Sequence, residues 1–308
     1  MPRLGSNGVG PAAAAFAPCH PAGTGLEAEQ VIRNILVALD GSQHAEGGLE
    51  YALWLASRLK AKLVGTHVID IVSIEGSFLH DVSGSLGFEP YLDFSSKMRE
   101  ALQERGAALL DLFKARCGER GVACDTALPL GVVANEICDR ARTADLVVLG
   151  HRGVNEQFST GLLGGTTESV ARKSPKPVLV CPATFREVTK PLLAYDGSQR
   201  ASAAMHTAAE VTSALGLPLT VVHVARDGGD GAAVLDEARR YLAAYDVAVS
   251  YETLTGPPHQ RIIDVLNGGA HDLLFIGAYG HSRIIEMVLG STTEYVLRNS
   301  PAPVFLTR

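Results

Sequence analysis

An internal repeat is the feature that most constrains the fold of this 308-residue chain. The segments Val31–Asp40 and Val188–Asp196 are both apolar runs that lead into Gly-Ser-Gln and then into a helical stretch. Further along, Leu163–Val180 and Leu289–Leu306 are identical at eleven of eighteen aligned positions. Because such matches recur in the same order, the sequence predicts two tandem copies of one domain.

The repeat also predicts where the domains lie. We expect a first domain over residues 29–184 and a second over residues 185–308. Residues 1–28 are rich in Ala, Gly and Pro and show no hydrophobic periodicity, so we expect a disordered tail. From His67 to Gly131 there are 64 positions, but from His223 to Gly256 there are only 33. The first copy therefore carries an insertion, which we place in the region 71–118.

Within the insertion, Ser73–Pro90 has the composition of a loop, and Phe94–Cys117 has the pattern of a long amphipathic helix. The expected apolar face of that helix comprises Met98, Leu102, Leu109, Leu110, Leu112 and Phe113. A loop of such length in a compact domain is usually functional. Two interpretations stay open: a lid over the first copy's site, or a cover for a surface between copies.

Each copy alternates apolar strands with helices, which predicts an α/β fold of βαβ units around a parallel sheet buried on both faces. We expect five strands in each copy. In the first copy they lie near Asn34–Leu39, Leu63–Val68, Cys124–Leu128, Leu146–Leu149 and Val178–Cys181. In the second copy they lie near Pro191–Tyr195, Leu219–Val224, Val247–Thr253, Leu273–Ile276 and Val304–Thr307.

Charge and composition exclude several classes of partner. The net charge of −6 and the absence of a basic cluster argue against nucleic-acid binding. The longest apolar runs are only strand-sized, far short of the ~20 residues that a membrane span needs. The five cysteines form no C-x-x-C pair, which favours reduced thiols used for packing in a cytoplasmic protein.

A glycine-rich loop follows the fourth strand of the second copy. Gly277 and Gly280 are followed, after nine residues, by Gly290, Ser291 and Thr292 at the start of a helix. Glycines permit close approach of the backbone to a ligand, and the amides of a helix N-terminus favour an anion. The pattern fits a phosphate site, but it equally fits an N-cap and turn glycines.

The position of the loop in the sheet favours a ligand site. In open parallel sheets, ligands bind at the carboxyl ends of strands where the strand order reverses. Asp196 ends the first strand and Gly277 ends the fourth, so both would meet there if these strands are neighbours. Val224, at the end of the second strand, would form an adjacent wall.

Together, Asp-Gly-Ser after strand one, His-Val at the end of strand two and G-x-x-G-x9-G-S-T after strand four resemble the universal stress protein family. The resemblance covers about residues 31–308. It implies two five-stranded parallel sheets in the order 3-2-1-4-5, with helices on both faces. It also implies ATP, with Mg²⁺, at the switch point and a regulatory role in the stress response. Members pair through their last strands, so we expect the two copies to pack face to face through Val178–Cys181 and Val304–Thr307, and the chain to form a homodimer.

The resemblance transfers to individual residues. In the second copy it implies that Asp196, Gly277 and Gly280 lie near the ribose and phosphates and that Val224 meets the adenine. The phosphate tail would be held by Gly290, Ser291 and Thr292. The first copy offers the corresponding positions Asp40, Val68, Gly150, Gly153, Gly164, Gly165 and Thr166. Its spacer has ten residues instead of nine, and Gly165 replaces the serine, so we expect the better site in the second copy.

Three classes of function follow: an ATP-binding regulatory protein, an interaction module with vestigial sites, or an ATP-using enzyme. The sequence has no S-G-G-x-D-S or H-I-G-H motif and no obvious general base, so we assign no catalytic residue. Slow hydrolysis of ATP by a bound water stays open. We expect His67 and His223 to be hydrogen-bonded inside the sheet. We expect Glu168 and Glu294 to interact with the helix dipole or to cap the first turn of the final helix in each copy. Asp40 and Asp196 would bind Mg²⁺ or cap the following helix.

Overall fold

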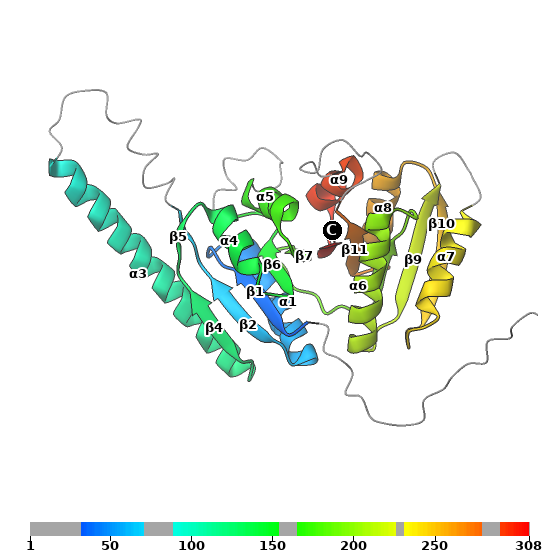
Figure 1. The fold of residues 1–308 in the computed structure, drawn as a ribbon, viewed down its shortest axis with the longest axis horizontal. Helices are drawn as coiled ribbons and strands as arrows, with labels where there is room; N and C mark the ends of the chain where they lie inside the picture. The colour runs from blue at the N-terminus through cyan, green and yellow to red at the C-terminus, as the bar shows by residue number, and fades with distance from the viewer. Residues whose placement is uncertain (1–31, 71–88, 154–164, 226–230, 279–289, 308) are drawn as a thin grey trace, which may run out of the picture.

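A computed structural model describes residues 32–70, 89–153, 165–225, 231–278 and 290–307. The expected tail, residues 1–28, and most of the expected loop Ser73–Pro90 lie outside them. The described residues form one ten-stranded sheet that runs through both halves of the chain (Figure 1). In the first half its strands are β1 (Asn34–Ala38), β2 (Lys62–Thr66), β4 (Cys124–Ala127), β6 (Leu146–Gly150) and β7 (Val178–Cys181). In the second half they are β8 (Pro191–Ala194), β9 (Leu219–Ala225), β10 (Val249–Thr255), β11 (Leu273–Gly277) and β12 (Val304–Thr307).

The order across the sheet is β10-β9-β8-β11-β12-β7-β6-β1-β2-β4. Each half by itself therefore follows the order 3-2-1-4-5 that the resemblance implied. The predicted α/β fold with tandem parallel sheets is confirmed. In both halves the first strand lies beside the fourth, because β1 pairs with β6 and β8 pairs with β11. This places the ends of these strands at the switch point of each half.

The two halves join through their last strands, as predicted. β12 pairs with β7 in antiparallel fashion, and Val304 lies opposite Val180. The other neighbouring strands of this sheet pair in parallel. The expected face-to-face packing was wrong: the pairing is edge to edge, because the last strand of each half has a free edge that hydrogen-bonds to the other, and one continuous sheet results. Phe275 and Phe305 stack across β11 and β12, with ring centroids 5.1 Å apart.

Helices cover both faces of the sheet. One face carries α1 (Gln43–Leu59), α3 (Glu89–Glu119), α6 (Gln199–Leu215) and α7 (Ala232–Leu242), which share a buried core. The other face carries α4 (Val133–Ala141), α5 (Gly165–Lys173), α8 (Pro258–Asn267) and α9 (Ser291–Asn299), which share a second core. Among the described residues, no helix combines the length and apolar character that a membrane span requires.

The long helix α3 belongs partly to the domain core. Its last part covers the sheet with Leu110, Phe113 and Cys117, all buried. Its beginning extends beyond the sheet in Figure 1. The expectation that Met98 and Leu112 belong to the apolar face was wrong, since their exposed fractions are 38 % and 66 %. Leu112 follows the buried Leu110 by two residues, about 200° around the helix, and so faces away from the sheet.

The end of α3 occupies the place that α7 occupies in the second half. Gly106 lies so close to His67 that a Cβ there would be 2.7 Å from its ring. In the same way, a Cβ at Gly231, the N-cap of α7, would be 2.5 Å from the ring of His223. The additional residues of the first half therefore lie before Gly106, and the rest of α3 is part of the common fold.

Strands two and three of the first half are interrupted. A two-stranded sheet continues them beyond the main sheet, formed by β3 (Ile69–Asp70) and β5 (Leu130–Gly131). Pro129 precedes β5, and proline has no N–H to donate to a ladder of hydrogen bonds. The corresponding strands of the second half, β9 and β10, run without a break.

Candidate functional site

The Asp-Gly-Ser turn at the end of strand one builds the first part of each site. In the second half, an Asp196 carboxylate oxygen accepts a hydrogen bond from the Ser198 amide at 3.0 Å. The Ser198 hydroxyl in turn caps α6 by accepting from the Ala201 amide at 3.2 Å. Gly197 adopts a φ of +77°, in the left-handed region that glycine adopts readily. The sequence thus forms a turn that fixes the carboxylate at the switch point.

The first half repeats this turn. An Asp40 oxygen accepts from the Ser42 amide at 2.9 Å, and Gly41 has a φ of +79°. The Ser42 hydroxyl caps α1. Serine, and not aspartate, is therefore the helix cap in both halves, while one oxygen of each aspartate holds the turn. Asp196 is exposed and Asp40 is half-buried.

The glycine that ends strand four permits close packing of a helix. A Cβ at Gly277 would lie 2.7 Å from the carbonyl carbon of Arg200, in the first turn of α6. A Cβ at Gly150 would lie 2.6 Å from the carbonyl carbon of His44, in the first turn of α1. These two predicted site residues therefore leave room for the helix to pack closely against the strand end. Arg200 and His44, which the motif had not indicated, come to the same rim.

The second loop glycine of the first half lies against the aspartate. A Cβ at Gly153 would be 2.8 Å from an Asp40 carboxylate oxygen. The loop and the strand-one turn thus meet, as the topology predicted. The corresponding Gly280, and Gly164 of the first half, lie outside the described residues.

A threonine that sequence reasoning missed attaches the last helix of each half to strand four. The Thr293 hydroxyl donates to the Gly277 carbonyl at 3.0 Å, and the Thr167 hydroxyl donates to the Gly150 carbonyl at 2.9 Å. Both threonines are buried. The signal was present in the sequence, because Thr-Thr-Glu recurs in both halves. The helix start is therefore held at the strand end.

The beginning of α9 carries the remaining predicted residues of the second site. Gly290 is the N-cap and, because it has no side chain, it cannot cap the first amides of the helix as serine does in α1 and α6. Ser291 is exposed and Thr292 is half-buried. The first amides of a helix have no partner within the helix, so an uncapped start suits an anion. In the first half, Gly165 and Thr166 occupy this position and both are exposed.

The glutamates near these helix starts are paired with arginines one turn further on. Glu294 forms an ion pair with Arg298 at 2.5 Å, and Glu168 pairs with Arg172. Both ion pairs lie within a single helix, which fits the expected structural role of the two glutamates.

Strand two contributes to both faces of the sheet. Val68 lies just after β2, which ends at Thr66 and not at Val68 as expected, whereas Val224 lies within β9. Val68 is buried, Val224 is half-buried, and both pack with the core beneath α4 and α8. The neighbouring histidines bond to strand one: Nδ1 of His67 lies 2.7 Å from the Leu39 carbonyl oxygen, and Nδ1 of His223 lies 3.0 Å from that of Tyr195. The interpretation of these histidines as hydrogen-bonded within the sheet is confirmed.

Within the described part of the chain, no group of three or more His, Cys, Asp or Glu side chains is arranged to hold a metal ion. Each site offers one aspartate at the strand end. Mg²⁺ commonly binds through one or two carboxylates together with substrate phosphates, so a single aspartate is compatible with a metal that arrives with a nucleotide.

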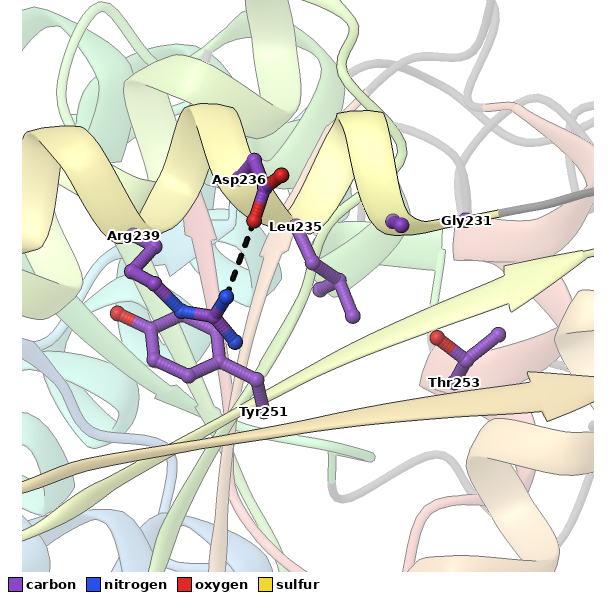
Figure 2. A pocket seen from close by; sticks show the side chains of 7 residues that line it. Gly231, Leu235, Asp236, Arg239, Tyr251 and Thr253 are labelled. Carbon is purple, nitrogen blue, oxygen red and sulfur yellow. Dashed lines mark hydrogen bonds and ion pairs between the residues drawn. The ribbon is translucent and has the colours of Figure 1, made fainter.

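A separate cavity of about 310 Å³ lies between α7 and β10 (Figure 2). Arg239 stacks over the ring of Tyr251 at 4.6 Å and pairs with Asp236 at 3.0 Å. The cavity is not the predicted site, and the ion pair neutralises its arginine. Thr253 lines this cavity in the second half, and the corresponding residue of the first half is Leu128. Leu128 lies against Gly106 of α3.

Comparison with known proteins adds evidence on the family. Residues 32–182 and 188–308 both match the sequence model of the Universal stress protein family. Universal stress protein Slr1230 of Synechocystis is 31 % identical over 287 residues, which covers 90 % of this chain and 100 % of the relative. A universal stress protein of Mycolicibacterium smegmatis is 26 % identical over 299 residues, covering 89 % and 96 %. The crystal structure of a universal stress protein from Archaeoglobus fulgidus superposes with a TM-score of 0.69 at 25 % identity, over 89 % of this chain and 98 % of that one.

Proposed function

Because the chain belongs to the universal stress protein family, we propose that it is an ATP-binding regulatory protein of the stress response. The nucleotide would lie at the carboxyl ends of strands one and four in each half. The observation that carries this proposal is the uncapped start of α9, which Thr293 holds at the end of β11. We place the protein in the cytoplasm.

The charges around the second site support an anionic ligand. The uncapped amides of α9 and the guanidinium of Arg200 would face the phosphates, and Ser291 and Thr292 would add hydroxyl donors. Asp196 would oppose a bare phosphate, so we expect Mg²⁺ to lie between the carboxylate and the phosphates. Val224 would contact the adenine from the end of β9.

The first site is built in the same way with fewer donors. Gly165 replaces Ser291, which removes one hydroxyl, and His44 replaces Arg200 at the rim. Gly153 and Asp40 are already in contact there. We therefore propose that ATP binds more tightly in the second half than in the first.

We assign no catalytic residue. The described acidic side chains near the helix starts, Glu168 and Glu294, are paired with arginines. An interaction module without nucleotide is the main alternative, and slow hydrolysis of ATP is a further one. Incubation with ATP and Mg²⁺, followed by measurement of released phosphate, tests the hydrolysis.

One pair of variants tests the nucleotide sites. Ser291→Gly copies the first half, and Gly165→Ser copies the second; a Cβ at Gly165 meets nothing within 4 Å. By calorimetry with ATP and Mg²⁺, Ser291→Gly should weaken the tighter site about ten-fold or more, as expected for one hydrogen bond to a charged group. Gly165→Ser should strengthen the weaker site.

The purified protein should also release a nucleotide when it is denatured, identified by chromatography and mass. Absence of nucleotide, together with no heat of binding at millimolar ATP, would favour the interaction module. Loss of affinity only in the Gly165→Ser protein would assign the better site to the first half.

We also propose a homodimer. The last strands β7 and β12 already pair within the chain, so a second copy would have to use another surface. Light scattering measures the mass: twice the chain mass of 32.5 kDa supports the dimer, and the mass of a single chain contradicts it.

A further inference from the structure

Two cysteines meet where α3 ends and β4 begins. Cys117 lies in the last turn of α3 and is completely buried, and Cys124 is the first residue of β4 and is half-buried. Cys117 belongs to the buried core on this face of the sheet, the Cys124 side chain packs against that core and lies near Cys117, and neither cysteine is in a disulfide. Gly121, with a φ of +64°, turns the chain between them. The other described cysteines lie elsewhere, Cys138 on α4 and Cys181 on β7.

The second half shows what this place requires for packing alone. Cys124 lies opposite Leu63, and the corresponding pair in the second half is Val249 opposite Leu219. Cys117 follows Gly106 by eleven residues, and Leu242 follows Gly231 by eleven. Two apolar side chains, Leu242 and Val249, therefore fill the position of the two thiols. The fold needs no sulfur here, so a pair of thiols in contact calls for a chemical explanation.

We propose that Cys117 and Cys124 are an oxidation site that forms an intrachain disulfide when the protein meets a peroxide. The thiolate of Cys124 attacks one peroxide oxygen, breaks the O–O bond and becomes a sulfenic acid, while the other oxygen leaves as hydroxide or water. The thiolate of Cys117 then attacks the Cys124 sulfur and expels the second hydroxide. In total, two thiols and one hydrogen peroxide give one disulfide and two waters.

Exposure decides the order of the two steps. Cys124 is reached from solvent, whereas Cys117 is covered by the sheet and helix, so Cys124 is the thiol that meets the peroxide. Burial raises the pKa of the Cys117 thiol to about 12. Little Cys117 thiolate exists at neutral pH, so the second step is slow and its rate rises with pH.

The disulfide would fix the end of α3 to β4, the edge strand of the sheet. The same end of α3 is already held to α1, because Arg120 pairs with Glu50 at 3.0 Å and Arg116 also pairs with Glu50. Closing the short loop from Cys117 to Cys124 removes freedom mainly from the unfolded chain. The oxidised protein should therefore melt at a higher temperature, by about 5 °C.

Mass spectrometry of the full-length protein tests the proposal. After treatment with hydrogen peroxide, the intact mass should fall by about 2 Da, the two hydrogens lost on forming one disulfide. A non-reduced digest should link the peptide of Cys117 to that of Cys124, and dithiothreitol should reverse both changes. Addition of two or three oxygens, with no linked peptide, would overturn the proposal.

Two variants complete the test. The double variant Cys117→Leu/Cys124→Val copies the second half, so it should fold, keep its mass under peroxide and show no rise in melting temperature. Cys138→Ser is the matched control and should still lose about 2 Da. Persistence of the loss in the double variant would assign the disulfide to other cysteines and contradict the proposal.

Discussion

Nε2 of His151 is hydrogen-bonded to the carbonyl oxygen of Leu297. His151 follows Gly150 at the end of strand four in the first half, and Leu297 lies in the last turn of α9. The glycine loop of one half therefore contacts the helix whose start belongs to the site of the other half. The residue corresponding to His151 in the second half is Ala278, which has no such group. This side-chain bond therefore leads from the loop of the first half to the helix of the second half, and Ala278 cannot form the reverse bond.

Replacing this histidine should destabilise the contact between the halves. We expect His151→Ala to lower the free energy of unfolding by about 1 kcal/mol, through loss of one partly buried hydrogen bond to a helix end. Urea denaturation measures the change. His271→Ala is the control, since it removes a solvent-exposed histidine bond to the Lys190 carbonyl. Equal losses in the two variants would show that the connection contributes nothing special.

The strand-four glycines should be required for folding before they matter for binding. Gly277→Ala and Gly150→Ala place a methyl group against the backbone of α6 or α1. We expect each to lower the free energy of unfolding by about 1–3 kcal/mol, the usual cost of overpacking. Gly165→Ala is the control, because its Cβ meets nothing within 4 Å. Unchanged thermal stability of Gly277→Ala would refute the close packing.

A charge at the central pair of strands should disrupt the continuous sheet. Val304 is 2 % exposed and lies opposite Val180 in the antiparallel pair. Val304→Lys buries an amine with no partner, at a cost of about 3 kcal/mol or more. Val132→Lys is the control, since Val132 is 45 % exposed. Denaturation reports the stability, and small-angle scattering reports whether the halves separate; an unchanged variant would contradict the burial.

A small and a large side chain that pack together in the first half have their sizes reversed in the second half. In the first half, Gly65 of β2 lies under Phe113 of α3, and a Cβ at Gly65 would be 2.6 Å from the Phe113 ring. The corresponding residues of the second half are Val221 and Ala238, both buried. Phe113→Ala should cost about 3–5 kcal/mol by leaving a cavity.

Adding Gly65→Val to Phe113→Ala copies the second half and should recover part of that loss. Gly65→Val alone should destabilise, because the ring occupies the space. A double-mutant cycle measured by urea denaturation gives the coupling between the two sites. Strictly additive effects would show that the two positions do not share this space.

Much of the fold could be predicted from local patterns. The strands Val178–Cys181 and Val304–Thr307 begin and end where the apolar runs predicted. Buried parallel strands are continuous apolar segments, so a sequence reveals them directly. The repeat then provided a second observation of each of the five strands of the main sheet in either half. The Asp-Gly-Ser turns could also be predicted, because their hydrogen bonds join residues only two positions apart in sequence.

The roles of single residues were less accessible. The motif indicated Gly277 as a ligand residue, but the crowding of its Cβ position by Arg200 involves segments 77 positions apart in sequence. Thr293 is likewise defined by its bond to the Gly277 carbonyl. Leu112 looked apolar and inward, yet only the orientation of α3 on the sheet decides which side is buried.

The sequence by itself determined the repeat, the strand positions and the polar residues that end the strands. The tertiary structure decided that the two sheets become one, that His151 reaches Leu297, and that Cys117 meets Cys124. The physical reason is that side-chain periodicity and turn chemistry act within a few residues. Close packing and hydrogen bonds between distant segments depend on distances that no one-dimensional pattern contains.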